Sequence, residues 1–358
     1  MKTFGEISMK KSLLALAALA AISGAAQAQS NVTIYGIVDM ALQHQNTGEK
    51  AGATLGLDSG IQSGSRLGFK GTEDLGGGLK ANFQLEMGVN ADTGSSAQGG
   101  LAFGRQAWVG LSGDFGSLNL GRQYTPAFIA IDSFDPFGTG MTTGTAGSGT
   151  SSFGAAHFFG GPSRVNNAIN YNTVSIDGFT GNLFYGVGEV AGNTSGNRYI
   201  GLSGAYNAGP VFATLAYTSA QNATGTNAKK SILLAGTYDF GVAKAHAAYS
   251  TIKDDGVPTP IDRRVWLLGA TVPVSAAGTI VADYIRSTVK NVGDANANHL
   301  ALGYTYSLSK RTNLYTSISR TANDANSALG SDDSGATFHP VTPGANVRLV
   351  NVGIRHKF

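Results

Sequence analysis

The chain has 358 residues, with 25 basic and 22 acidic side chains and no cysteine. Without cysteine there are no disulfides, thiolate zinc sites or redox pairs. There is no basic stripe and the aromatic residues are dispersed, so we expect no nucleic-acid partner. Glycine supplies 51 residues and charged side chains only 13%, a composition that disfavours a helical protein and suits strands joined by turns.

The first 28 residues have the pattern of an export signal. From Met9 the chain has two lysines, an apolar run and small residues ending Ala26-Gln27-Ala28, which is typical of a cleaved secretory signal and too short for a membrane-spanning helix. We expect the mature chain to begin at Gln29 and residues 1–8 to be an upstream over-extension. Residues 29–358 then form one domain, whose length suits a single large barrel.

Segments with an apolar residue at every second position recur from residue 32 to the C-terminus. In LKANFQLEMGVN, residues 79–90, Leu79 and Phe83 belong to one face and Lys80 and Glu86 to the other, as in a strand with two chemically different faces. The 16 segments of this kind span residues 32–40, 65–71, 79–90, 103–111, 117–123, 164–173, 181–189, 199–206, 211–219, 231–240, 242–251, 263–272, 278–289, 299–308, 311–320 and 346–358.

The connections between these segments alternate between seven tight turns and eight longer polar loops. An antiparallel meander therefore has its turns at one end and its long loops at the other, which is the asymmetry of transmembrane barrels. A sheet in a membrane must close, because unpaired edge groups are costly in hydrocarbon. We predict an all-β fold, a 16-stranded antiparallel transmembrane barrel whose apolar face meets lipid or a neighbouring subunit and whose polar face lines a water-filled lumen.

Motifs along the whole mature chain resemble the general-diffusion porins of Gram-negative outer membranes, and their β-proteobacterial branch in particular. They are VTIYGIVDMAL, SRLGFKGTEDLGGGLKANFQLE, FGRQAWVGL followed by GSLNLGRQ, and the C-terminal VGIRHKF. The resemblance implies an outer-membrane channel for passive diffusion of small hydrophilic solutes and ions, without a cofactor and usually homotrimeric. The strand that ends at Phe358 resembles the signal read by the outer-membrane insertion machinery.

The resemblance also implies that the third long loop folds into the lumen, where acidic residues face a basic wall. Residues 124–163 form that loop, and we expect its two carboxylates, Asp132 and Asp135, at the constriction; a surface or capping role is the alternative. Arg66, Arg105 and Arg164 match the basic wall by motif.

Strand alternation places Arg66 and Arg164 on the lumen side, and for Arg105 we expect an interior position with Trp108 outward. Arg122, at the base of the loop, is the expected loop anchor. Guanidinium groups facing carboxylates across a narrow opening orient water and bias which ions pass.

Three further residues are expected on the lumen face: Asp39, Lys80 and Glu86. Three arginines against two aspartates suggest a mild preference for anions, which these additional charges could reverse.

Three other functions would suit a barrel of this kind. A barrel enzyme would need a catalytic set, but the six histidines (44, 157, 246, 299, 339 and 356) form no recognisable group, and neither G-x-S-x-G nor H-E-x-x-H occurs, so we expect no catalytic residue. A channel specific for sugars or organic anions remains open, because the third loop contains phenylalanines that could form an aromatic slide: Phe128, Phe134, Phe137, Phe153, Phe158 and Phe159. An adhesin with a blocked lumen would not conduct ions.

Acidic pairs in the long loops, Asp254–Asp255 and Asp332–Asp333, are usually solvated. We expect no metal site.

Overall fold

A computed structural model of the protein describes residues 31–47, 53–142, 162–257, 260–330 and 342–358. Its strands are β1 (Asn31–Asn46), β2 (Ala53–Ser59), β3 (Arg66–Gly76), β4 (Leu79–Asn90), β5 (Ser95–Ser96), β6 (Gln106–Gly113), β7 (Gly116–Tyr124), β8 (Arg164–Asn172), β9 (Phe179–Gly186), β10 (Tyr199–Ala208), β11 (Val211–Gln221), β12 (Ala228–Asp239), β13 (Lys244–Asp254), β14 (Ile261–Pro273), β15 (Gly278–Val289), β16 (Ala297–Ser307), β17 (Thr312–Asn323) and β18 (Val347–Lys357). Two short helices, α2 (Ala97–Gly100) and α3 (Pro126–Phe134), lie in the connections. No helix within these ranges is long and apolar enough to cross a membrane. The predicted signal, residues 1–28, lies outside the described residues.

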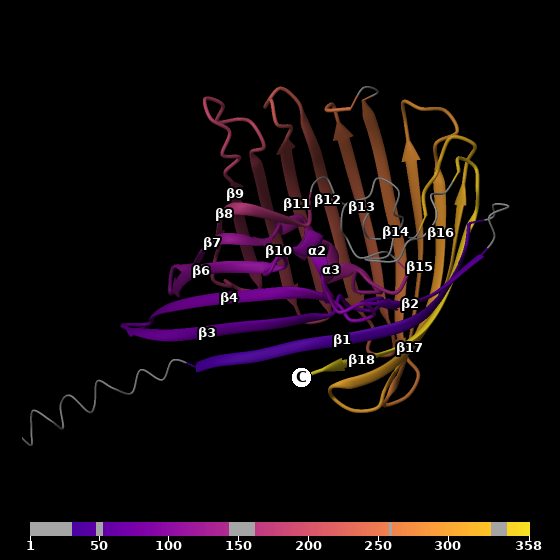
Figure 1. Ribbon diagram of the computed structural model, residues 1–358, viewed down its shortest axis with the longest axis horizontal. Coiled ribbons are helices and arrows are strands. Elements are labelled where there is room, and N and C mark those ends of the chain that lie inside the picture. The colour runs from indigo at the N-terminus through magenta and orange to yellow at the C-terminus, as the bar shows by residue number, and fades with distance from the viewer. Residues whose placement is uncertain (1–30, 48–52, 143–161, 258–259, 331–341) are drawn as a thin grey trace, which may run out of the picture.

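The sheet closes on itself. The first strand pairs antiparallel with the last, from Ile37 opposite Lys357 to Asn46 opposite Arg348. On its other side β1 pairs with β3 along its first half and with β2 along its second half, so β2 and β3 share one position in the wall. The two-residue β5 is an addition at the end of β4. The predicted barrel with 16 wall positions is therefore confirmed (Figure 1).

The two faces of the wall differ as predicted. On β16, Leu300 and Leu302 are 62% and 51% exposed, whereas His299 and Ala301 between them are 0% and 1% exposed. This period of two follows from the pleat of a strand, which points successive side chains to opposite faces. The outer face is apolar over most of its height, and the inner face carries polar side chains and packed residues.

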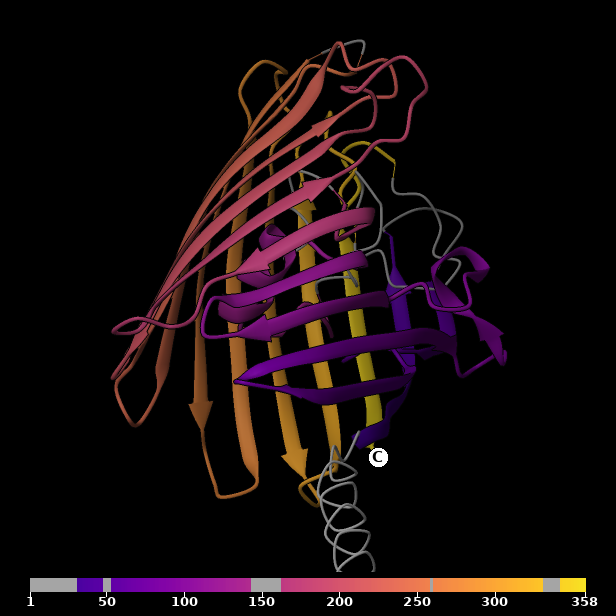
Figure 2. The same ribbon diagram turned by 90° about the vertical axis from the view of Figure 1, so that its left-hand side faces the viewer.

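Short and long connections alternate around the barrel, which confirms the predicted asymmetry. Figure 2 shows long loops of the second half of the chain at the upper rim and short turns at the lower rim. The turn from β3 to β4 uses Gly76, Gly77 and Gly78, all with positive φ, a conformation that glycine adopts without the steric cost of a Cβ atom.

The first long connection contains more strand than predicted. We expected a loop after Met40, but β1 continues to Asn46 and β2 occupies Ala53–Ser59. Polar His44 and Asn46 on the outer side of β1 weaken the hydrophobic alternation there, which is why the pattern missed this part. Residues 60–65 separate β2 from β3, and Ile61 within this segment is completely buried.

The predicted outward position of Trp108 is wrong. Trp108 lies directly opposite Gln84 across the β4–β6 pair, and Gln84 donates a hydrogen bond to Tyr35, which in turn bonds Glu86 on the lumen side. Trp108 therefore faces the lumen. The alternation was misread because β6 begins only at Gln106, so Arg105 precedes the strand and is not bound by its period.

Apolar side chains on the inner wall hold the third long connection. From α3, Ile131 and Phe134 are fully buried and pack in one cluster with inner-face residues that include Leu233, Val265 and Leu267. Helix α3 begins where Thr125 caps the amide of Phe128 and Pro126 occupies the first turn, a favoured start signal.

The chain after α3 reaches the other side of the barrel. Phe137 and Met141 pack with inner-face residues of β1, β15, β16 and β17. The Met141 amide donates to the Ile61 carbonyl, and Asn351 donates to the Met141 carbonyl over 2.8 Å. These contacts support the prediction that the third loop folds into the lumen. Residues 143–161, including Phe153, Phe158 and Phe159, lie outside the described residues.

Candidate functional site

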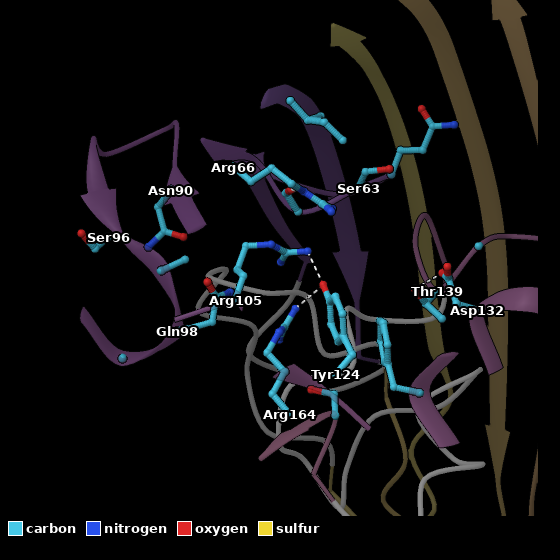
Figure 3. A pocket seen from close by; sticks show the side chains of 18 of the residues that line it. Ser63, Arg66, Asn90, Ser96, Gln98, Arg105, Tyr124, Asp132, Thr139 and Arg164 are labelled. Carbon is cyan, nitrogen blue, oxygen red and sulfur yellow. Dashed lines mark hydrogen bonds between the residues drawn. The ribbon is translucent and has the colours of Figure 1, made fainter. Parts of the chain in front are cut away.

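A cavity of about 960 Å³ opens inside the barrel beside α3. Among the residues that the structure describes, its charged lining consists of six basic residues and one carboxylate: Arg66, Arg105, Arg122, Arg164, Arg355, Lys357 and Asp132. The basic residues come from β3, β7, β8, β18 and the residue before β6, whereas Asp132 comes from α3. Figure 3 shows Arg66, Arg105 and Arg164 together on one side of the cavity, with Asp132 and Thr139 on the other.

Three of the predicted basic residues begin wall segments that follow long loops. Arg66 is the first residue of β3, Arg164 is the first of β8, and Arg105 directly precedes β6. Because each follows a long connection and precedes a strand running back to the short-turn end, the three lie at a similar level of the wall.

Tyr124 joins two of these arginines, a role that no pattern in the sequence indicated. Both Arg105 and Arg164 donate to its hydroxyl oxygen. The Arg164 guanidinium carbon also lies 4.2 Å from the centre of its ring, and the ring stacks on Phe128 at 4.3 Å. A phenol that accepts from two guanidinium groups and presents its π face to one of them holds like charges side by side.

Glu86 lies behind the arginines. Its carboxylate is 2.7 Å from the Arg105 Nε atom and 4.0 Å from the Arg66 guanidinium, and Tyr35 donates to it over 2.9 Å. Glu86 is 3% exposed and is not part of the cavity lining. It faces the lumen side, as predicted, but it offsets part of the charge of the basic wall instead of facing permeating ions.

Asp132 and Asp135 have different surroundings. Asp132 lines the cavity and accepts from the Thr139 hydroxyl over 3.1 Å; burial raises its pKa above the ordinary value for an aspartate, and the bond from Thr139 opposes that shift. Asp135 accepts from the amides of Phe137 and Thr139 and is 6% exposed. Burial raises the pKa of Asp135 to about 7.

Asp135 therefore has the capping role that was the alternative at the sequence level. It does not line the cavity, and we leave it out of the proposed constriction.

Arg122 is held at the base of the loop, but by other partners than expected. Its Nε donates to the Gly104 carbonyl over 2.8 Å and Nη1 donates to Asn166 over 2.6 Å; neither partner belongs to the third loop. An irregularity in the β7–β8 register after Gly121 turns its side chain toward the cavity, as bulges do. Arg122 thus fastens the neighbouring wall and adds a charge to the site.

The remaining predicted residues lie away from the cavity. Asp39 is fully buried, accepts from Tyr315 and from the Ser63 amide, and so holds the 60–65 break against the wall. Lys80 lies opposite Ser112 near the short-turn end, on the face that also carries Glu86. Phe358 exchanges two backbone hydrogen bonds with Gly36 and closes the seam of the barrel; its role as an assembly signal stays a prediction.

Arg355 and Lys357 are site residues that we did not single out from the sequence. The signal was present, because both alternate with outward-facing Ile354 and Phe358 in the last strand. Arg355 donates to Asn313 and to Ser63, so its guanidinium is fixed at the cavity edge. Among the described residues, no group of three or more histidines or carboxylates converges to hold a metal ion.

Acidification tests Asp132, the one carboxylate that lines the cavity within the described part of the chain. Protonating Asp132 removes the one negative charge among the charged lining residues, while guanidinium groups stay charged at any relevant pH. Because burial raises the Asp132 pKa, we expect anion preference to rise as pH falls, beginning above the ordinary range for an aspartate. Reversal potentials in planar bilayers at a series of pH values measure this.

An Asp132→Asn variant is the control, and it should show high anion preference at every pH.

Asp135 predicts a second pH effect, on the stability of the loop. An aspartate whose pKa is raised on folding stabilises the fold at pH values below its unfolded pKa, and this contribution is lost as pH rises toward about 7. Acid should therefore hold the loop in place; in the Asp132→Asn variant, which has no cavity charge left to neutralise at position 132, a conductance that increases on acidification would contradict this.

Comparison with known proteins places the chain among outer-membrane proteins. The family described as Gram-negative porin matches residues 15–326. The outer membrane porin protein 32 of Delftia acidovorans is 38% identical over 98% of this chain and 100% of its own length. The structure described as an anion-selective porin from Comamonas acidovorans has a TM-score of 0.80 at 35% identity, covering 92% of this chain and 100% of that one.

A more distant structure is similar in fold alone. The trimer form of OmpT, an outer membrane protein of Vibrio cholerae, has a TM-score of 0.66 at 16% identity and covers 92% of this chain and 99% of that one.

Proposed function

Because this chain belongs to the Gram-negative porin family of the bacterial outer membrane, we propose that its channel favours small hydrophilic anions. As a porin it forms a water-filled pore for passive diffusion and is not an enzyme. We propose that Arg66, Arg105 and Arg164, facing Asp132, form the constriction.

The observation that carries this proposal is the charge of the cavity lining, to which the described residues contribute six basic side chains and one carboxylate. Rings of Arg and Lys side chains favour anions in pores, because they lower the electrostatic energy of a passing anion and raise that of a cation. The guanidinium groups of Arg105, Arg122 and Arg164 are held by hydrogen bonds to protein atoms, so the field keeps its orientation as water and solutes exchange.

The sign of the reversal potential tests the proposal. In a planar bilayer that separates dilute from concentrated KCl, we expect the porin to give the sign of a chloride-permeable channel at neutral pH. A potential of the opposite sign would refute anion preference, and the absence of any conductance would favour a blocked barrel instead.

A channel specific for organic anions is the second candidate. The stacked pair of Tyr124 and Phe128 beside Arg164 favours it, because a flat anion could contact an aromatic face and a guanidinium together. Of the other phenylalanines named from the sequence, Phe134 and Phe137 are buried against the wall and do not form a slide. Block of chloride current by low concentrations of an aromatic carboxylate would identify this specificity, and unhindered current would favour general diffusion.

We further propose that the porin assembles as a homotrimer after cleavage of residues 1–28. The trimeric form of the distant fold relative supports the first part, and the A-x-A pattern before Gln29 supports the second. Light scattering in detergent measures the oligomeric state, and a monomer would contradict the trimer. Mass spectrometry of the mature chain measures cleavage, and a chain that retains its first 28 residues would contradict it.

A further inference from the structure

A second cavity, of about 480 Å³, lies in the lumen between the proposed constriction and the short-turn rim. Its lining comes from β1, β3, β4, β6 and β7, which are neighbours in the wall (Figure 1). Within the described residues this lining contains one charged side chain, Lys70, and most of the others are hydroxyls and amides. A concave site of this volume suits a small organic molecule. Its chemistry therefore differs from that of the basic cavity beside α3.

Trp108 occupies the middle of this second cavity wall. Lys70, Gln84 and Trp108 lie directly opposite one another on β3, β4 and β6, and Gly121 of β7 lies opposite Trp108 on its other side. A Cβ atom at Gly121 would lie 2.3 Å from the Ala107 carbonyl oxygen, so glycine is required there. Because Gly121 has no side chain, this row of the wall leaves the indole uncovered on the β7 side. The indole is partly exposed, and its apolar surface meets the water of the lumen.

The indole of Trp108 differs from the other aromatic rings close to it in having no partner. Tyr124 stacks on Phe128, and Tyr35 donates to Glu86. In the described part of the chain, neither a ring contact nor a hydrogen bond engages the Trp108 indole. Both the ring face and the N–H group are therefore available to a solute, as the apolar body and the polar tip of this side chain.

Polar side chains around this indole are held in place and can still form further hydrogen bonds. Gln84 donates to Tyr35 over 2.5 Å, which fixes its amide and leaves the carbonyl oxygen to accept from another donor. Asn82 donates to Ser112 over 2.9 Å. The Asn119 side chain has no hydrogen-bond partner among the described residues, so its amide offers both donors and an acceptor. Groups that are fixed before a ligand arrives lose little entropy when they bind it.

An uncharged sugar ring matches this set of groups. A pyranose has a face of C–H groups, which packs on an aromatic ring, and a rim of hydroxyls, each of which can donate and accept. Amide side chains also donate and accept, and Lys70, whose Nζ atom lies 5.3 Å from the centre of the Tyr35 ring, adds a donor. Small anions have a more basic site beside α3, to which the described residues contribute six cations.

We propose that the cavity around Trp108 binds small uncharged sugars, with a sugar ring stacked on the indole and its hydroxyls bonded to Gln84 and Asn119. The flux of these solutes stays passive but saturates, because a solute that binds in the lumen must leave before the next one passes. This site is separate from the constriction, and its occupancy does not depend on the anion preference proposed above.

Two single-tryptophan variants test binding directly, because the chain has two tryptophans. Trp266→Phe leaves the emission of Trp108, and Trp108→Phe leaves that of Trp266, which lies against Tyr284 on the outer face. The full porin, in a detergent without a sugar headgroup, is titrated with glucose, maltose, or sorbitol, which has hydroxyls but no ring. We expect a saturable change in the emission of Trp108 with both sugars and none with sorbitol. The emission of Trp266 should not respond to any of the three.

Planar bilayers test the consequence for the channel. Maltose should reduce the chloride current in a saturable way, beyond the effect of sorbitol at equal viscosity. Trp108→Ala should weaken this block roughly tenfold, because the aromatic contact is lost, and Asn119→Ala should weaken it several-fold through the lost hydrogen bond. The matched control, Trp266→Ala, removes the outer tryptophan and should leave the block unchanged. Heat-modified mobility in gels checks that every variant is folded.

Three results would overturn the proposal. They are an equal response to sorbitol and to the sugars, an equal block of the Trp108→Ala and Trp266→Ala porins by maltose, and a stronger response to glucuronate than to glucose, which would assign the cavity to anions. Chloride preference is measured in the absence of sugar, so a failure of the anion proposal and a failure of the sugar site give different results.

Discussion

Replacing Arg66 and Arg164 together by glutamine should shift the permeability ratio of chloride to potassium toward cations by roughly tenfold or more. A unit charge about 4 Å from a passing ion contributes on the order of 1 kcal/mol even at the dielectric constant of water, and more where the pore narrows. Both side chains line the cavity, and glutamine keeps polarity and much of the volume. Reversal potentials in a KCl gradient provide the measurement.

A matched control for this variant comes from two lysines elsewhere in the same lumen. Lys70 and Lys80 face the interior nearer the short-turn end, and neither lines the cavity beside α3. Lys70→Gln/Lys80→Gln removes the same net charge, and we expect only a small change in selectivity. If the two double variants shifted the ratio equally, the preference would arise from overall charge and the proposed constriction would be wrong.

Phe134→Ala should release the third loop and increase the single-channel conductance. Phe134 is fully buried against the inner wall, and its carbonyl contacts His246. Truncating a buried phenylalanine costs about 3–5 kcal/mol. Here the loss weakens the packing of α3 against the inner wall. The wall itself stays stable, because its strands are joined by backbone hydrogen bonds. We expect a larger and noisier conductance with the barrel still folded, measured in planar bilayers and by heat-modified mobility.

Ile129→Ala is the control on the same helix, because Ile129 is 48% exposed. It should change conductance little. A Phe134→Ala porin with the conductance of the unmodified protein would mean that α3 does not narrow the pore.

Much of the fold follows from local pattern. Strand positions, turn positions and the apolar outer face were predictable because a period of two records which side of a strand meets hydrocarbon. The pattern failed where polar residues occupy the outer face, as at His44 and Asn46 in β1, and at the boundary of β6, where Arg105 precedes the first paired residue. Whether a side chain faces lipid or the lumen depends on the residue at which strand pairing begins. The hydrophobic pattern locates that residue only within a few positions.

The candidate site also contains some residues that the sequence predicted and others that only the structure shows. Arg66 and Arg164 were placed on the lumen side by alternation, and Asp132 by its position in the third loop; the structure brings all three to one cavity. Tyr124 could not be predicted as the shared acceptor of Arg105 and Arg164, because it depends on three chain segments meeting. The different surroundings of Asp132 and Asp135 also depend on how the loop turns after α3.

The sequence by itself determined a closed barrel and its family, because alternation, turn chemistry and composition are local properties that every strand repeats. Only the tertiary structure decided which charges face the pore. Glu86 and Asp135 are carboxylates like Asp132, yet one lies behind Arg105 and the other caps the backbone of its own loop. The position of Glu86 depends on Arg105 from another chain segment, and that of Asp135 on the way its own loop turns after α3; no periodicity encodes either arrangement.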